Sequence, residues 1–304
     1  MIRILITAFA ALAGLAFGSF LNVCVTRWPE GESIVAPRSR CRSCARALTW
    51  WENIPIASWL VLGGRCRTCK AWIGWRYPLV ELATGALWAL VAWRSTAELF
   101  DSRIPASLLK FDLAESAVTL FLLWILVALA ALDAENFWLP DSITLPVAGL
   151  GFVVAIVRLV LPVKLGSIPG LPLIAGLENM PSGFYGAVIG RFLGILAAAL
   201  LILLIRWIYK LIRKREGIGL GDAKLMAMLA AWLGLEGALL SLVIGVALGA
   251  AIALAALALP SKRSVEEGWA LKKLPLGAFL CIGGIVSALW GQPILAAYLR
   301  WAGF

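Results

Sequence analysis

Histidine is absent from the 304-residue sequence. Its absence excludes Ser-His-Asp and Cys-His catalysis, HExxH metalloprotease sites and histidine proton relays. Acid–base chemistry in this chain must therefore use Asp, Glu, Lys, Tyr, Cys or water. Charged residues are also scarce: they make up 14% of the chain, and 17 acidic residues stand against 27 basic ones. The GxGxxG spacing of a dinucleotide-binding strand and helix is missing as well.

The apolar residues are gathered into long runs. Hydrophobic residues make up 62% of the chain and the mean hydropathy is +0.93, whereas an average soluble domain has about 45–50% apolar residues. Each run has about twenty residues, enough to cross a hydrocarbon core of roughly 30 Å as a helix. The runs are continuous rather than alternating, which argues against a β-barrel. We therefore expect an all-α membrane protein, a polytopic bundle of about eight transmembrane helices.

The apolar runs predict where these helices lie. They are expected at residues 4–25, 77–97, 113–132, 142–161, 184–211 and 222–233, with a seventh that follows a brief turn at "GLEG" and reaches 259, and an eighth that ends near 299. The sequence shows no internal repeat. It predicts three parts: a first transmembrane helix at 1–25, a loop domain at 26–76, and a transmembrane core at 77–304.

The positive charge is concentrated in three regions. Nine Lys/Arg lie between Arg27 and Arg76, five between Arg206 and Arg215, and four between Lys262 and Lys273. The positive-inside rule places these regions in the cytoplasm. With eight crossings, the alternation of the helices agrees with that placement. The charge therefore indicates membrane topology, and we expect a lipid bilayer but no nucleic acid as a partner.

Four cysteines form two Cys-x-x-Cys pairs in the polar loop, namely Cys41 with Cys44 and Cys66 with Cys69. Two such pairs, with 21 residues between them, are typical of a tetrahedral Cys₄ zinc site. The metal would close a loop that has little core of its own. Disulfides or free thiols are the alternatives, and a cytoplasmic loop argues against disulfides. Four protein ligands leave no open coordination position, so we expect a structural metal.

Two aspartates lie at the expected cytoplasmic boundary of the bilayer. Asp133 ends the third helix in "DAENFWLPD", and Asp222 begins the sixth in "GLGDAK". Ionisable groups at such depth usually face the bundle interior or a water-filled cavity and serve a function. Two adjacent carboxylates can share a proton and activate water against a carbonyl group, which is aspartic-protease chemistry without histidine. Asp222 could equally be the N-cap of its helix.

Five further residues are expected to support this site. Gly219 and Gly221 would let the backbone approach a neighbouring chain closely. Lys224 lies two residues after Asp222, so it points away from Asp222 and could simply snorkel. Asp141 could cap the fourth helix. Glu81, near the start of the second helix, could pair with an arginine, line the same cavity, or lie exposed at the boundary.

Five blocks of this sequence, in order, resemble bacterial type IV prepilin peptidases. They are "GSFLNVCVTRWP" (Gly18 to Pro29), the two cysteine pairs flanking "WWENIPIASWLVLGGRC", then "RYPLVELATG", "DAENFWLPD" and "GLGDAK". The resemblance covers most of the chain. Together with the four cysteines, it is very specific, whereas GxGDxK alone is only moderately so.

The resemblance implies a GxGD-type intramembrane aspartic protease with Asp133 and Asp222 as its catalytic pair. It implies that the protein sits in the bacterial inner membrane and cleaves a short basic leader after a glycine at the cytoplasmic face. The substrates would be type IV prepilins or type II secretion pseudopilins. It also implies N-methylation of the new N-terminus with S-adenosylmethionine, although no motif identifies a site for that methyl donor.

Three other functions remain open from the residues alone. The chain could be a proton-coupled transporter that uses the embedded aspartates, although this leaves the cysteine loop unexplained. It could be a scaffold with a zinc loop, in which Asp133 and Asp222 would tolerate substitution. It could also be a peptidase without methyltransferase activity.

Overall fold

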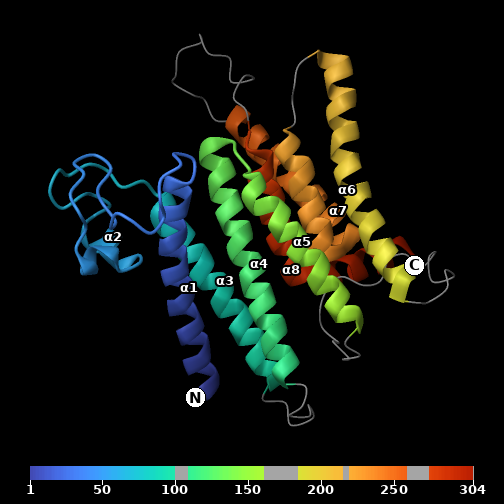
Figure 1. Ribbon diagram of the computed structural model, residues 1–304, viewed down its shortest axis with the longest axis horizontal. Coiled ribbons are helices and arrows are strands. Elements are labelled where there is room, and N and C mark those ends of the chain that lie inside the picture. Colours follow the sequence, from blue (N-terminus) through green and yellow to red (C-terminus); the bar gives the residue numbers. More distant parts are fainter. Residues whose placement is uncertain (100–108, 161–183, 215–218, 259–273, 304) are drawn as a thin grey trace. The chain divides into compact units, whose positions relative to one another are not determined.

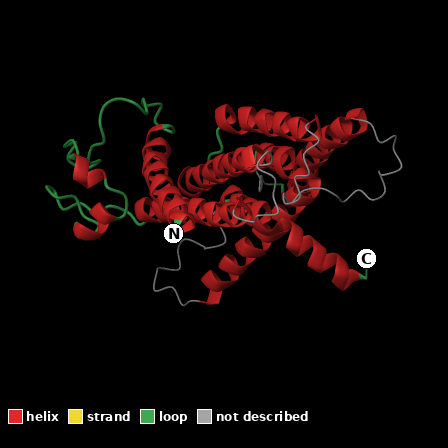
Figure 2. Ribbon diagram, turned by 90° about the horizontal axis from the view of Figure 1, so that it is seen from below, coloured by secondary structure: helices red, strands yellow, loops and turns green. Residues whose placement is uncertain are grey.

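The computed structural model describes residues 1–99, 109–160, 184–214, 219–258 and 274–303. These residues are mostly helical, apart from the loop at 28–75, and no strand is present among them, only two isolated β-bridges (Figure 2). Six helices in this described part are long and apolar enough to cross a membrane. The expected all-α polytopic architecture is therefore confirmed.

The helices follow the predicted order. In sequence they are α1 (Ile2–Arg27), η1 (Trp50–Asn53), α2 (Ala57–Val61), α3 (Arg76–Leu99), α4 (Leu109–Asn136), α5 (Asp141–Val160), α6 (Phe184–Arg213), α7 (Leu220–Ala258) and α8 (Leu276–Ala302). The six apolar ones are α1, α4, α5, α6, α7 and α8. The helix expected at 77–97 is present as α3, although it is not among the six.

The chain divides into two compact units, Met1–Ala131 and Leu132–Phe304. This boundary falls within α4, and the division at residues 25 and 76 stays a prediction. In the first unit α1 lies alongside α3 (Figure 1). The two backbones touch at glycines: a Cβ at Gly14 would lie 2.9 Å from Gly85 Cα, and one at Gly18 would lie 2.7 Å from Glu81 Cα. Small residues permit this close approach of membrane helices.

In the second unit α7 packs against α5, α6 and α8. It consists of two helical arms, because the non-helical conformation of Gly234, with φ 79° and ψ 171°, interrupts it. The turn expected at "GLEG" is thus this single residue. A side chain would be strained in that conformation, which glycine adopts readily.

The first arm of α7 begins at one end of the second unit, and the second arm returns to the same end. Near the start of the first arm, a Cβ at Gly221 would lie 3.1 Å from Leu139 Cβ, and one at Gly277 in α8 would lie 2.8 Å from Leu139 Cδ1. In the second arm, a Cβ at Gly245 would lie 3.0 Å from the carbonyl oxygen of Phe279. Both arms therefore reach the first turns of α8, and the starts of α5, α7 and α8 lie at one end of this unit (Figure 1).

Candidate functional site

Asp133 lies in the last turn of α4, and its side chain is buried, with the residue only 6% exposed. It meets the N-terminus of α8: Asp133 Oδ2 accepts a hydrogen bond of 2.8 Å from the backbone N–H of Ala278. Pro275 is the N-cap of α8, so this N–H is one of the four that have no partner within the helix. The buried acid thus satisfies a helix end that lies 145 residues further along the chain.

Asp222 is the third residue of α7 and is 7% exposed. Its Oδ2 accepts a hydrogen bond of 3.0 Å from the backbone N–H of Gly219, the residue before the helix. This contact is the second half of a capping box, in which the side chain at the third helical position reaches back to the N-cap. Asp222 is therefore not the N-cap that the sequence allowed, and the N-cap position belongs to Gly219.

The two carboxylates lie close enough to interact electrostatically. Gly221 and Gly277 make room for this approach, since each meets Leu139 from a different helix. At Gly277 the contact extends to the acid itself: a Cβ there would lie 2.9 Å from Asp133 Oδ2. The structure thus brings together the two aspartates and the two glycines of the "GLGD" motif that the sequence singled out.

Each aspartate faces the positive end of a helix dipole. The N-termini of α7 and α8 carry partial positive charge and unpaired N–H donors, which stabilise carboxylates there. Gly277 and Ala278 of α8 were not identified from the sequence. In the sequence, Pro275 followed by Leu276 and Gly277 indicates only that a helix starts here with a small residue in its first turn.

Lys224 and Asp141 form an ion pair beside these acids. Lys224 Nζ lies 2.6 Å from both carboxylate oxygens of Asp141, and the two side chains are 36% and 56% exposed. Asp141 is the first residue of α5. The sequence predicted snorkelling for Lys224 and a helix cap for Asp141. In the structure the two side chains instead pair with each other and join α7 to α5.

Glu81 lies in the first unit, buried between α1 and α3 at 7% exposure. Its Oε2 accepts a hydrogen bond of 2.7 Å from the backbone N–H of Ile56, in the loop between the cysteine pairs. Ile56 has a φ of 59°, a conformation that costs energy in a β-branched residue. The structure thus assigns Glu81 a loop-anchoring contact, and its expected role at the aspartate site stays a prediction.

The four loop cysteines could hold one metal ion. The sulfur atoms of Cys41, Cys44, Cys66 and Cys69 all lie within 4.8 Å of one another, and Cys41 Sγ is 3.7 Å from Cys69 Sγ. Four sulfurs at about 2.3 Å from one ion in a tetrahedron lie about 3.8 Å apart. The spacing therefore suits a tetrahedral site. All six cysteines lie in described residues, and none forms a disulfide.

The two cysteine pairs are built alike. In the first, Cys41 N–H donates to Arg46 O and Ala45 N–H to Cys41 O; in the second, Cys66 N–H donates to Ala71 O and Lys70 N–H to Cys66 O. Ala45 and Lys70 both have positive φ. This short repeat, "RCRSCA" and "RCRTCK", corrects the expectation of no internal repeat. It is easily missed in the sequence because it covers one knuckle rather than a domain.

The loop also holds a partly buried ion pair, in which the Glu52 side chain is buried and the Arg46 side chain is partly exposed. Arg46 donates to both carboxylate oxygens of Glu52, and Thr49 donates to Glu52 through its N–H and its hydroxyl. The Arg46 guanidinium, with help from Thr49, lowers the pKa of Glu52 to about 2. Backbone N–H groups of Cys69 and Thr68 lower the pKa of the Cys66 thiol to about 6. A thiol of low pKa binds metal readily near neutral pH, because the thiolate is the ligand.

The remaining two cysteines differ in their surroundings. Cys24 and Cys281 are both fully buried, Cys24 in α1 and Cys281 in α8. Cys281 lies near enough to Asp133 and Asp222 to interact electrostatically with both. It follows Gly277 by one helical turn, so it helps to pack the α8 face that meets the acids.

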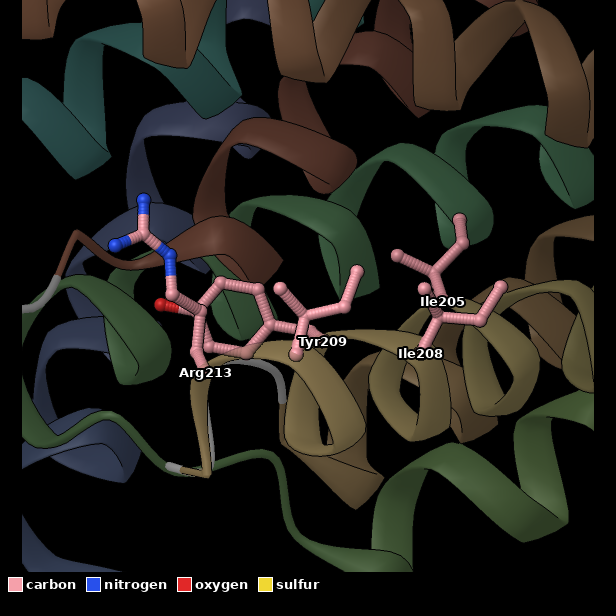
Figure 3. A pocket seen from close by; sticks show the side chains of 5 residues that line it. Ile205, Ile208, Tyr209 and Arg213 are labelled. Carbon is pink, nitrogen blue, oxygen red and sulfur yellow. The ribbon is translucent and has the colours of Figure 1, made fainter.

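A surface groove of about 390 Å³ runs along α6 (Figure 3). It is lined by Ile205, Ile208, Tyr209, Ile212 and Arg213, which follow one stripe of a single helix. Apolar side chains on a membrane-spanning helix are expected to face lipid. The groove contains no acidic group and does not mark the reaction site.

Comparisons with known proteins agree with the motifs. The sequence model of the bacterial Peptidase A24 N-terminal domain matches residues 12–95, and that of the type IV leader peptidase family matches residues 120–254. A prepilin leader peptidase/N-methyltransferase from Pseudomonas aeruginosa is 34% identical, with 96% of this chain and 93% of that protein covered.

Other relatives carry the same name. The protein from Burkholderia pseudomallei strain 1026b is 35% identical over 94% of this chain and 86% of its own length. The protein from Stutzerimonas stutzeri is 33% identical over 96% and 93%. No solved structure matches this chain. Nothing in these relatives supports the transporter alternative.

Proposed function

The chain belongs to the type IV leader peptidase family, and on that premise we propose that it is an intramembrane aspartic endopeptidase. Its substrates are type IV prepilins or type II secretion pseudopilins, and it removes their short basic leader after a glycine at the cytoplasmic membrane face. The observation that carries this proposal is the pair of buried carboxylates of Asp133 and Asp222, each held at a helix N-terminus.

The pair suits general acid–base hydrolysis. Two neighbouring carboxylates in an apolar site do not both ionise easily, so we expect the pair to hold one proton between them. The ionised member takes a proton from water as the water attacks the scissile carbonyl carbon, and the protonated member donates its proton to the carbonyl oxygen, which gives a tetrahedral intermediate. The member that took the water proton then donates it to the leaving nitrogen as the C–N bond breaks. The other member takes a proton back from a hydroxyl group of the intermediate, so the pair again holds one proton. The backbone donors fix each carboxylate but leave lone pairs for water and for substrate. No covalent intermediate is required.

The position of the site suits a substrate with an apolar helix and a basic leader. The basic segment Arg206–Arg215 ends shortly before Gly219, and by the positive-inside rule it lies on the cytoplasmic side of a bacterial inner membrane. The substrate helix can pack in the bilayer while its leader stays outside. Gly219 is exposed and leaves the backbone just before Asp222 open to an extended substrate, whereas Gly221 is packed against Leu139.

We assign a structural zinc ion to the four loop cysteines. The sulfur spacing fits tetrahedral coordination, and four thiolate ligands leave no position for water. When bound, the ion supplies a crosslink between the two knuckles. It has no step in peptide hydrolysis.

The names of the relatives support a second activity, N-methylation of the new N-terminus. The methyl donor is S-adenosylmethionine, which supplies a methyl group from its sulfonium. The methylation step is assigned to none of the residues described above, and a peptidase without this activity is the alternative. Transfer of labelled methyl groups from S-adenosylmethionine to a cleaved pilin peptide separates the two.

The peptidase is tested with purified protein and a prepilin, with product masses as the readout. Asp133→Asn and Asp222→Asn should each abolish leader removal while the protein stays folded, because each removes one member of the acid pair. Glu135→Gln is the matched control, since Glu135 is an exposed acid two residues from Asp133. It should cleave normally. Leader removal by both aspartate variants would refute the assignment.

A further inference from the structure

The ion pair between Lys224 and Asp141 joins the two segments that carry the acids. Asp133 and Asp141 lie at the two ends of the connection from α4 to α5, and Asp222 and Lys224 lie in the first turns of α7. We propose that Lys224 and Asp141 are a positioning pair, which holds this connection against α7 and so sets the separation of the two carboxylates. This inference rests on the proposed function.

Three contacts between the same two segments support it. Asp133 interacts with Asp222, Leu139 packs so closely on Gly221 that a Cβ there would lie 3.1 Å from Leu139 Cβ, and Lys224 Nζ lies 2.6 Å from both oxygens of Asp141. The first contact is repulsive when both acids are ionised, and the second is a small apolar contact. The ion pair is the one contact of the three in which opposite charges attract each other.

The chemistry needs such a clamp. Two carboxylates in a medium of low dielectric repel one another, and their hydrogen bonds tie them to different helices, α8 and α7. Neither hydrogen bond therefore fixes one acid relative to the other. A bidentate ion pair across the same junction does, because Asp141 follows Asp133 by only eight residues in the chain.

The exposure of the pair indicates what its loss should change. At 36% and 56% exposure, an ion pair contributes little to global stability. A displacement of about 1 Å between reacting groups, however, costs about 100-fold in rate. Breaking the pair should therefore lower the turnover rate far more than the melting temperature.

The test uses single variants and a charge swap in the full-length protein. Lys224→Met keeps the apolar stem and removes the charge, and Asp141→Asn removes the other charge. We expect each to lower kcat for prepilin cleavage by about 10- to 100-fold with KM changed less than about threefold. The double variant Lys224→Asp with Asp141→Lys restores the attraction with the charges exchanged, and its kcat should be at least about tenfold above that of the single variants. Lys224→Arg should retain most activity.

Glu32→Gln is the matched control. It breaks the exposed ion pair between Arg40 and Glu32, which has a distance of 3.0 Å and exposures of 44% and 37%, and it should leave kcat unchanged. Wild-type kcat in both single variants would overturn the proposal. So would a charge swap no more active than the single variants, or a rise in KM with kcat intact, which would indicate that Asp141 contacts the basic leader instead.

Hydrogen exchange gives a readout that needs no substrate. The amides of 219–224 should exchange faster in Lys224→Met and Asp141→Asn than in the wild type, and the charge swap should restore their protection. Unchanged exchange in the single variants would overturn the clamp even if they cleaved slowly. If the wild type fails to cleave any prepilin while exchange responds as expected, the proposed function fails and the clamp stands.

Discussion

Replacing Gly277 by alanine should disable the aspartate site while sparing the fold. The new methyl group would lie 2.9 Å from Asp133 Oδ2 and 2.8 Å from Leu139 Cδ1. Ordinary contacts of this kind lie at about 3.4 Å or more, so Asp133 must move by about 0.5 Å or α8 must move away. Either shift stretches the 2.8 Å hydrogen bond from Ala278 N–H.

The expected loss of kcat follows from the weakened hydrogen bond to Asp133 and from the displacement of its carboxylate. A hydrogen bond to a charged group contributes about 1.5–3 kcal/mol, and misplacement of a catalytic group by about 1 Å costs about 100-fold. A shift half as large should lower kcat by about 10- to 50-fold, which is about 1.4–2.3 kcal/mol in activation free energy. Gly277→Val, with two further methyl groups, should lose activity below detection.

The assay is kcat for prepilin cleavage, measured beside the melting temperature. Gly149→Ala is the open-space control, because nothing lies within 4 Å of a Cβ there; it should keep wild-type kcat. Gly283→Ala is the packing control, because its Cβ would clash with the backbone of Ser241; it should lower the melting temperature. Wild-type cleavage by Gly277→Ala would refute the view that the α8 N-terminus holds Asp133 during catalysis.

Three further predictions concern the loop and its anchor. Cys44→Ser should release the metal, so bound zinc measured by elemental analysis falls well below one per chain; retained stoichiometric zinc would count against four-cysteine coordination. Glu81→Leu removes the acceptor of the partly buried Ile56 N–H, at a cost of about 1 kcal/mol. It should speed hydrogen exchange at Ile56, whereas Glu81→Gln keeps an acceptor and should speed it less. Arg46 lowers the pKa of Glu52 from 4.5 to about 2, so the wild-type loop should be more stable than Glu52→Gln by the full amount above pH 4.5, and this difference should disappear as the pH falls toward 2. Hydrogen-exchange protection of the loop amides, measured as a function of pH, tests this. A stability difference that grew on acidification would contradict it.

Local signals in the sequence predicted much of this fold. The helices lie within a few residues of their expected bounds because apolar runs of membrane length are unambiguous. The cysteine pairs meet because each knuckle is a local turn, with its hydrogen bonds closed inside six residues. The break in α7 falls where "GLEG" indicates a turn, since Gly234 adopts a conformation that only glycine takes without strain.

Contacts between distant segments could not be predicted in the same way. The partner of Lys224 lies 83 residues away, so the sequence offered only snorkelling for Lys224 and capping for Asp141. The partner of Asp133 lies 145 residues away, in the first turn of α8. An N-cap role for Asp222 stays open in the sequence because apolar runs locate a helix start only to within two residues or so, and those residues decide which amide the carboxylate can reach.

The reversal at Gly234 explains how two helix N-termini reach one pair of acids. The first arm of α7 begins at the aspartates, and a straight helix of 39 residues would end far from them. The next helix would then start at the opposite end of the unit. Because the chain turns back at Gly234, the second arm returns to Phe279. Helix α8 therefore begins beside Asp133, and its Ala278 N–H, which has no partner within the helix, donates to the carboxylate. A chain with no histidine thus keeps two acids in an apolar bundle by directing two helix dipoles at them.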